Sequence, residues 1–239
     1  MSSAGAPAGL ELQITRKAYR AASGEAFDVL DGVKLRLARG EVAAVVGPSG
    51  CGKTTILRIV AGLDADFDGA VALPAGNRLG MVFQEPRLLP WRTVADNVRL
   101  AAPAASADLI AQLFAMLGLA QHTRHYPSEL SLGLARRVAL ARAFAIVPDV
   151  LLLDEPFVSL DATLAQELRH ELAVLVGQRP VTTLLVTHDI DEAVELADRV
   201  VLLSPRPARV ISEIAIDAPR SARTPAELVR LRDLVRERL

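Results

Sequence analysis

The chain has 239 residues, of which 51% are hydrophobic and 23% charged, a composition that allows a substantial core and fits one α/β domain. Its formal net charge of −1 argues against nucleic acid and anionic membranes as partners. One cysteine excludes an intrachain disulfide, and the lack of a membrane-length apolar run or a signal-peptide pattern predicts a cytoplasmic protein.

The first predicted elements are strands over residues 12–14 and 33–37, where apolar and polar side chains alternate as in half-buried strands. The loop between them is expected to carry three basic residues and one aromatic residue: Arg16, Lys17, Arg20 and Tyr19. The aromatic ring of Tyr19 can stack on an adenine base. It can equally be a partly buried surface residue, and the spacing favours neither interpretation.

The next stretch joins a buried strand to a helix. Residues 42–46 form a continuous apolar run, which predicts a parallel strand, and a helix is predicted over 56–61, ended by Gly62. Between them lie residues that fit the phosphate-binding pattern: Gly47, Pro48, Ser49, Gly50, Cys51, Gly52, Lys53, Thr54 and Thr55. Strand, glycine loop and helix are the context that this motif requires. The alternative is a glycine turn that binds nothing.

Each residue type in this stretch has a chemical reason. The glycines let the backbone curl toward a phosphate, and the curled N–H groups form an anion-binding nest at a helix N-terminus. Lys53 supplies a mobile charge for the β- and γ-phosphates, and the Thr54 hydroxyl is a ligand for Mg²⁺. We also expect Cys51 to be solvent-exposed with a lowered pKa, so that MgATP protects it from an alkylation that blocks nucleotide binding.

The middle of the chain is predicted to change from strands to helices. Strands are expected near 70–73 and over 79–83, the second ending at Gln84. Helices running to about residues 101, 117 and 147 are expected to start at three capping residues: Thr93, Ser106 and Ser131. One side of the last helix is expected to be kept polar by its arginines: Arg136, Arg137 and Arg142. Because these helices interrupt the strand–helix alternation, we expect a helical subdomain over roughly 86–146.

The remainder returns to alternating strands and helices. Strands are predicted over 150–153, 181–187, 200–203 and 209–214, and helices over 163–176 and 190–197. Residues 224–227 form a capping box with proline at the first helical position, which predicts a final helix.

Polar side chains follow several of these strands, at the end where parallel sheets bind ligands. We assign Asp154 to Mg²⁺ and Glu155 to polarising the attacking water. His188 can hydrogen-bond the γ-phosphate, and Gln84 can reach Mg²⁺ or the attacking water through its side-chain carbonyl. The alternative interpretations are two acids that cap a strand and a structural histidine.

Over roughly residues 11–215 the chain resembles the nucleotide-binding subunits of ABC transporters. The landmarks of that family occur in its usual order: Tyr19, 47–55, Phe83-Gln84, 130–134, 151–156, 159–161 and 187–189. Residues 88–91 and 137–143 resemble the nitrate, sulfonate and taurine importer branch.

The resemblance implies a single domain over 1–239, with a P-loop NTPase core, a mainly parallel sheet, an N-terminal antiparallel β subdomain, the inserted helices of 86–146, and a C-terminal strand and helix over 205–239. It implies a head-to-tail homodimer around two ATP molecules and Mg²⁺, in which Ser131 and Gly133 act on the ATP of the partner subunit and Asp161 lies at the dimer seam. It also implies permease subunits near Trp91, a solute-binding protein outside the membrane, and a location at the cytoplasmic face.

One position departs from the family pattern. The family usually has glycine where this chain has Leu132, and glutamine or methionine where it has Leu134. Our hypothesis is that Leu132 points away from the nucleotide, so that dimer closure is preserved but weakened; the alternative is a site that binds ATP better than it turns it over. The leading function is an ATPase that powers import of a small anionic or sulfur-containing solute. The alternatives are an ABC ATPase for lipid transport or export, and a nucleotide-dependent switch that does not hydrolyse ATP.

Overall fold

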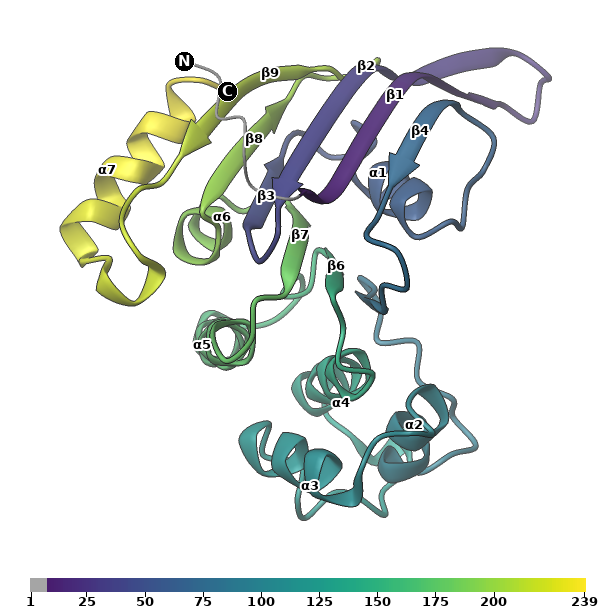
Figure 1. Cartoon of the computed structure of the whole chain (residues 1–239), viewed down its shortest axis with the longest axis vertical. Coiled ribbons are helices and arrows are strands. Elements are labelled where there is room, and N and C mark those ends of the chain that lie inside the picture. Colours follow the sequence, from purple (N-terminus) through teal and green to yellow (C-terminus); the bar gives the residue numbers. More distant parts are fainter. Residues whose placement is uncertain (1–7) are drawn as a thin grey trace.

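A computed structural model describes residues 8–239, whose strands form two sheets with helices grouped below and beside them (Figure 1). Within these residues the larger sheet has the strand order β5-β6-β7-β3-β8-β9. Its strands are β3 (Val42–Val46), β5 (Leu79–Val82), β6 (Val150–Asp154), β7 (Thr182–Thr187), β8 (Arg199–Leu203) and β9 (Val210–Ala215). Neighbouring strands are parallel except β8 and β9, which are antiparallel. The predicted mainly parallel sheet is therefore confirmed.

The central strand β3 shows why the parallel strands are apolar throughout. All of its residues are buried, but successive side chains enter different cores. Val42, Ala44 and Val46 pack in the core shared with most of the helices, whereas Ala43 and Val45 pack in the core shared with the second sheet. Because both faces of the sheet are covered, an alternating polar pattern has no place in these strands.

The strand order brings distant segments of the chain to one edge of the sheet. Strand β7 lies between β3 and β6 and is parallel to both. The three carboxyl ends therefore lie side by side, and at or just after them come the phosphate-binding stretch, Asp154-Glu155 and His188. This arrangement is the one that positions a ligand beyond the ends of parallel strands.

The smaller sheet is antiparallel and corrects one sequence-based expectation. It consists of β1 (Ala8–Arg20), β2 (Ala26–Ala38) and β4 (Asp68–Ala72), in the order β2-β1-β4. Tyr19 and its basic neighbours lie within β1, and Tyr19 pairs with Phe27, so their placement in a loop was wrong. The two strands continue to pair beyond the half-buried segments, where the alternating pattern no longer marks them.

Helix α1 (Lys53–Val60) follows the phosphate-binding stretch, and the helices α2 (Val94–Ala101), α3 (Ala107–Met116) and α4 (Leu132–Ala145) lie in the lower part of Figure 1 with the short turn η1 (Pro127–Glu129). The capping predictions are confirmed, because the side chains of Thr93, Ser106 and Ser131 each accept a hydrogen bond from the backbone N–H three residues later. Helix α1 begins three residues before its predicted start, and α4 ends before Val147, which has a left-handed φ of 53°.

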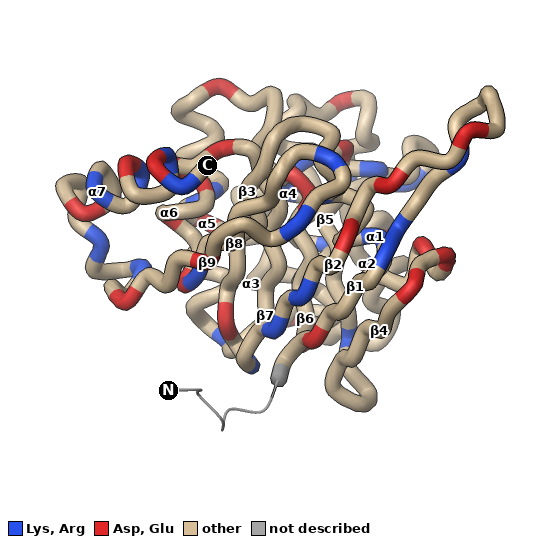
Figure 2. The backbone as a smooth tube through the Cα atoms, turned by 90° about the horizontal axis from the view of Figure 1, so that it is seen from above, with Lys and Arg blue, Asp and Glu red and all other residues tan. Residues whose placement is uncertain are grey.

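The C-terminal third contains α5 (Ala162–Gly177), α6 (Ile190–Leu196), η2 (Arg220–Ala222) and α7 (Pro225–Arg236), and the predicted capping box of Thr224 and Glu227 starts α7. Among residues 8–239 no helix combines the length and apolar character needed to cross a membrane. Basic and acidic residues are intermixed, as Figure 2 shows for α7. This distribution agrees with the near-zero formal net charge.

Candidate functional site

The phosphate-binding stretch forms a loop between β3 and α1 whose backbone only glycine can follow at two points. Gly50 and Gly52 have φ values of 75° and 120°. A Cβ atom at Gly52 would lie 2.7 Å from Cδ2 of Leu30, so substitution here is blocked by space as well as by conformation. Gly52 is also the N-cap of α1 and provides no capping side chain. The first N–H groups of α1 therefore remain available to an anion.

Lys53 is a buried cation held mainly by backbone carbonyls. Its side chain is 4% exposed, and its Nζ atom donates hydrogen bonds to the carbonyl oxygens of Gly47 at 2.8 Å and Pro48 at 3.1 Å. Oε1 of Glu155 lies 3.8 Å from this nitrogen. Neutral carbonyl oxygens compensate the positive charge of a buried ammonium group only in part, so the site fits a negatively charged phosphate beside Lys53.

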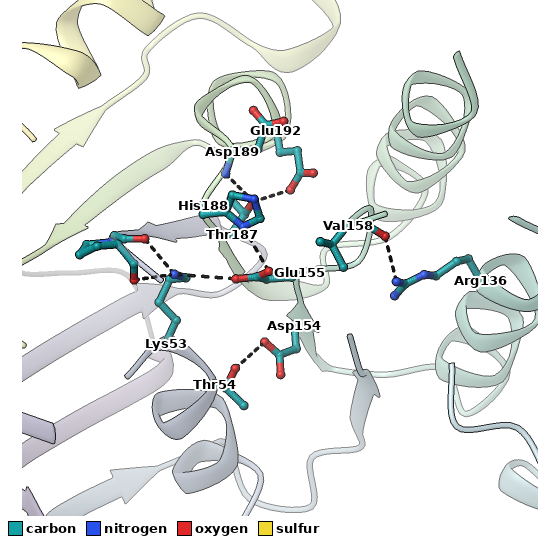
Figure 3. A network of polar contacts seen from close by, with 12 residues as sticks. Lys53, Thr54, Arg136, Asp154, Glu155, Val158, Thr187, His188, Asp189 and Glu192 are labelled. Atoms are coloured by element: carbon teal, nitrogen blue, oxygen red, sulfur yellow. Dashed lines mark hydrogen bonds and ion pairs between the residues drawn. The ribbon is translucent and has the colours of Figure 1, made fainter. Parts of the chain in front are cut away.

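Thr54 and Asp154 form an oxygen pair of the kind that Mg²⁺ prefers. The Thr54 hydroxyl donates a hydrogen bond of 3.0 Å to Oδ1 of Asp154 (Figure 3). Burial raises the pKa of Asp154, and the nearby charge of Glu155 adds to this effect. A divalent cation beside the pair would favour the ionised carboxyl, so these residues fit a magnesium ion.

Gln84 was expected in the same group, and the structure places it near but not in contact. It follows β5 and is exposed. The parallel register, which pairs Val82 with Leu153, puts Gln84 level with Glu155 in the neighbouring segment. Within residues 8–239 its side chain makes no hydrogen bond to Thr54 or Asp154.

Glu155 and His188 meet across the ends of β6 and β7. Oε2 of Glu155 lies 3.1 Å from Nδ1 of His188. Glu155 has a φ of 43°, which non-glycine residues rarely adopt, and its backbone N–H donates to the carbonyl of Val186 at 2.9 Å. Figure 3 shows its carboxylate between Lys53 and His188. A carboxylate fixed between a cation and an imidazole is placed to accept a proton.

A cavity of about 210 Å³ lies over the phosphate loop. It is lined by Tyr19, which the sequence analysis singled out, and by Phe27 and Arg206, which it did not. The Tyr19 hydroxyl donates a 2.6 Å hydrogen bond to Asp64. Phe27 is 38% exposed, with its ring centroid 6.4 Å from that of Tyr19. The guanidinium group of Arg206 lies 5.7 Å from the Phe27 ring and donates to the Gly50 carbonyl. The β1–β2 register brings Phe27 here, but no local pattern marks Arg206.

Cys51 contradicts the expectation of an exposed, reactive thiol. Its side chain is 2% exposed and packs in the apolar core that includes Ile56 and Leu57. Burial raises the pKa of the thiol, and this effect exceeds the opposing influence of Lys53. The loop directs this side chain into the core, so Cys51 can contribute only its backbone to a bound anion.

The residues expected to act on a partner's nucleotide have structural roles within their own chain. Ser131 caps α4, and Asp161 caps α5 by accepting a 3.0 Å hydrogen bond from the N–H of Leu164. Gly133 is buried, and a Cβ atom there would lie 2.5 Å from Cδ2 of Leu164. Leu132, the first residue of α4, is 43% exposed. Position 133 therefore needs glycine because α4 packs closely on α5, whether or not a phosphate binds there.

Two arginines of α4 turn inward rather than lining a polar face, which corrects a further expectation: Arg136 is buried and Arg142 is half-buried. Arg136 donates to the carbonyl oxygen of Val158 at 3.1 Å (Figure 3). It also donates to the carbonyl oxygen of Phe83 at 3.4 Å. Arg142 donates to two carbonyls in the loop after β5, those of Pro86 and Arg87. Burial lowers the pKa of both guanidinium groups. Helix α4 is thus tied to the segments that follow β5 and β6.

Comparison with known proteins agrees with this geometry. Residues 30–158 match the family described as ABC transporter. The aliphatic sulfonates import ATP-binding protein SsuB 2 of Burkholderia cenocepacia (strain HI2424) is 46% identical, over 92% of this chain and 84% of that protein. The corresponding SsuB 1 of Pseudomonas aeruginosa (strain UCBPP-PA14) is 45% identical, over 93% of each chain. The chain therefore belongs to the ABC transporter family, as an ATP-binding ATPase.

A solved structure has the same fold. The ATP-binding cassette MJ0796, in a dimeric post-hydrolysis state bound to ADP and Pi, superimposes with a TM-score of 0.77 and 28% sequence identity. The match covers 88% of this chain and 100% of that one. The predicted fold class is confirmed.

Proposed function

We propose that the chain is the ATP-hydrolysing subunit of an importer for a small sulfonate-like anion. The import function rests on the names of relatives that are 41–46% identical. The observation that carries the ATPase mechanism is one cluster of polar contacts at the ends of the parallel strands, which contains Lys53, the Thr54–Asp154 pair and the Glu155–His188 pair. The chain works as a homodimer with permease subunits at the cytoplasmic face, supplied by a solute-binding protein outside the membrane. Residues 86–146 are its helical subdomain, whose loop with Trp91 contacts the permease.

The phosphate loop binds the triphosphate through Lys53 and the N–H groups at the start of α1. Thr54, Asp154 and Gln84 would hold Mg²⁺, which would neutralise charge on the phosphates. Tyr19 stacks on the adenine base, and its ring is held in place by the bond from its hydroxyl to Asp64.

Glu155 is the catalytic base in this proposal. Its carboxylate accepts the proton of a water molecule whose oxygen attacks the γ-phosphorus, while the bond from that phosphorus to the ADP oxygen breaks. His188 orients Glu155 and hydrogen-bonds the γ-phosphate. Loss of the γ-phosphate then removes a contact of His188, which is how the protein detects hydrolysis.

The amino-terminal end of α4 completes the nucleotide site of the partner subunit through Ser131 and Gly133, with Asp161 at the dimer seam. A helix N-terminus carries partial positive charge, and the dimeric MJ0796 structure shows that related chains form dimers. Leu132 occupies an ordinary helical position without a left-handed φ. Its exposed side chain leaves room for closure, at reduced strength.

The test compares MgATP hydrolysis and size in ATP for the wild type and Glu155→Gln. We expect the wild type to hydrolyse ATP, and Glu155→Gln to bind ATP without turnover and accumulate as a dimer. Glu25→Gln, an exposed glutamate in the β1–β2 turn, is the matched control and should behave as wild type. Turnover that survives in Glu155→Gln excludes its role as the base. If the wild type binds ATP but does not hydrolyse it, the result would favour a nucleotide-dependent switch over an ATPase.

A further inference from the structure

A buried carboxyl group lies behind His188 and has no role in the mechanism above. Glu192, on the first turn of α6, is 5% exposed. Its Oε2 atom accepts a 2.5 Å hydrogen bond from the hydroxyl of Thr187, the last residue of β7. Thr187 is itself 1% exposed. A buried carboxyl with one short hydrogen bond from a buried hydroxyl is a costly arrangement, which indicates a specific use.

The Thr187 hydroxyl connects this carboxyl to the turn that carries His188. Its oxygen accepts a 2.9 Å hydrogen bond from the backbone N–H of Asp189, and its proton is therefore free to go to Glu192. The Asp189 side chain in turn accepts a 2.7 Å bond from the N–H of Asp191. The residues on both sides of His188 are held by one chain of hydrogen bonds that ends at Glu192 (Figure 3).

The charges around Glu192 oppose one another. Burial and the charge of Asp189 raise the pKa of Glu192, whereas the hydrogen bond from Thr187 and the charges of Arg169 of α5 and His188 lower it; the net pKa is about 7. Arg136 of α4 is also within electrostatic reach, since Glu192 raises its pKa. Two other acids of α6 are paired: Glu195 with Arg169 at 2.6 Å, and Asp191 with Arg232 of α7 at 2.5 Å. Arg223 also reaches α6, where its Nη1 atom donates to the carbonyl oxygens of Val194 and Glu195. With a pKa of about 7, Glu192 changes charge near neutral pH.

We propose that Glu192 is a positioning residue for His188, which it holds against Glu155 through the Thr187 hydroxyl and the turn at Asp189. The ionised carboxylate accepts a strong hydrogen bond from the Thr187 hydroxyl and so keeps His188 directed toward Glu155 and the nucleotide. Protonation weakens this link because a neutral carboxyl is a poorer acceptor. This role rests on the proposed function of His188 and explains why a carboxyl is buried in α6 although it touches neither the nucleotide pocket nor solvent.

The experiment measures kcat and KM for MgATP from about pH 6 to 9, together with the titration of the His188 ring by NMR in the nucleotide-free chain. Glu192→Gln keeps an acceptor for Thr187 but removes the charge. We expect its kcat to fall roughly threefold above pH 7 and to lose the decline that the wild type shows below pH 7. KM should change less than about twofold, because the phosphate loop is untouched. The NMR signals of the His188 ring should differ from those of the wild type across this pH range, because the turn that holds the ring has lost its charged acceptor.

Two further variants separate positioning from general stability. Thr187→Val removes the link and should lower kcat about tenfold, whereas Thr187→Ser keeps the hydroxyl and should restore it. Combining Thr187→Val with Glu192→Gln should cost little more than Thr187→Val alone, because both act through one bond. Asp191→Asn is the matched control: it changes another acid on the first turn of α6, with an exposed side chain paired to Arg232, and should leave both readouts unchanged.

The outcomes distinguish this role from the proposed ATPase. If the wild type does not hydrolyse ATP, the proposed function fails, and the NMR titration of His188 alone decides the positioning role. If Glu192→Gln and Thr187→Val both keep the wild-type kcat and the wild-type titration of His188, the positioning role is overturned while the ATPase stands. A rise in KM at constant kcat would also overturn it, because Glu192 would then act on binding.

Discussion

The amino group of Lys17 offers a sharp test of how this fold stabilises its antiparallel sheet. The Lys17 side chain is 1% exposed, and its Nζ donates to Oδ1 of Asp64 at 2.8 Å and to the carbonyl of Asp66. Its Nζ also lies 4.4 Å from the Tyr19 ring centroid, and the Tyr19 hydroxyl binds the same Asp64 carboxylate. Asp64→Ala therefore removes the buried carboxylate that pairs with the Lys17 charge, and also releases the Tyr19 hydroxyl.

The expected cost follows from burial. Removing one member of a buried ion pair leaves an uncompensated charge and destabilises proteins by about 3–5 kcal/mol. For a chain of this size each kcal/mol lowers Tm by about 2–4 °C, so we expect a drop of roughly 10 °C. The second carboxylate near Lys17, that of Asp66, lies 3.6 Å away and is 99% exposed. Solvent screens it, so Asp66→Ala should cost less than about 1 kcal/mol and serves as the matched control.

The assay is chemical denaturation followed by circular dichroism, with calorimetry for Tm. The paired variant Lys17→Met/Asp64→Leu removes both charges and should recover much of the stability that Asp64→Ala loses. If Asp64→Ala costs no more than Asp66→Ala, burial does not determine the strength of this pair and the reasoning is wrong.

The same pair predicts how stability depends on pH. Burial raises the pKa of Asp64, but the hydrogen bonds from Lys17 and Tyr19 outweigh it and leave the pKa below its ordinary value. Its contribution is therefore present above about pH 4 and is lost as the pH falls through the lowered value. Burial lowers the pKa of Lys17, but Asp64 raises it by more. That contribution is present below about pH 10 and is lost as the pH rises further. Asp64→Ala should flatten the acid limb of the wild-type profile.

Three other predictions follow from burial and contacts. Cys51 is 2% exposed and its thiol has a raised pKa, so maleimide should label it slowly with or without MgATP, and quickly only in denaturant. Fast labelling that MgATP suppresses would instead support an exposed, reactive thiol. Arg136→Met removes the hydrogen bonds to Phe83 and Val158, which destabilises the fold, but it also removes a buried charge that has no ion-pair partner. The free energy of unfolding should therefore change by less than about 2 kcal/mol, while ATPase activity falls. Intact activity would argue against a role for α4 in fixing the segments after β5 and β6. Trp91 is 68% exposed, so acrylamide should quench its fluorescence strongly in the isolated chain and weakly when the permease is bound. Equal quenching in the two states would show that the permease does not cover Trp91.

Local patterns predicted the elements that depend on neighbouring residues. Thr93, Ser106 and Ser131 cap the helices that they were expected to cap, because a capping bond reaches only three residues along the chain. The end of α4 was placed too late, since the left-handed φ of Val147 has no sequence signal. Tyr19 was assigned to a loop because pairing with Phe27 depends on a second strand.

The sequence by itself determined the class of this protein. The phosphate-binding stretch, its flanking strand and helix, and the acids and histidine that follow buried strands are each short, continuous segments with characteristic chemistry. Only the tertiary structure decided which side chains meet across those segments. It buried Cys51 and Arg136, brought Phe27 and Arg206 to the pocket, and connected Glu192 to the turn at His188. Burial and hydrogen-bond partners depend on strand order and helix packing, and residues far apart in the chain set both.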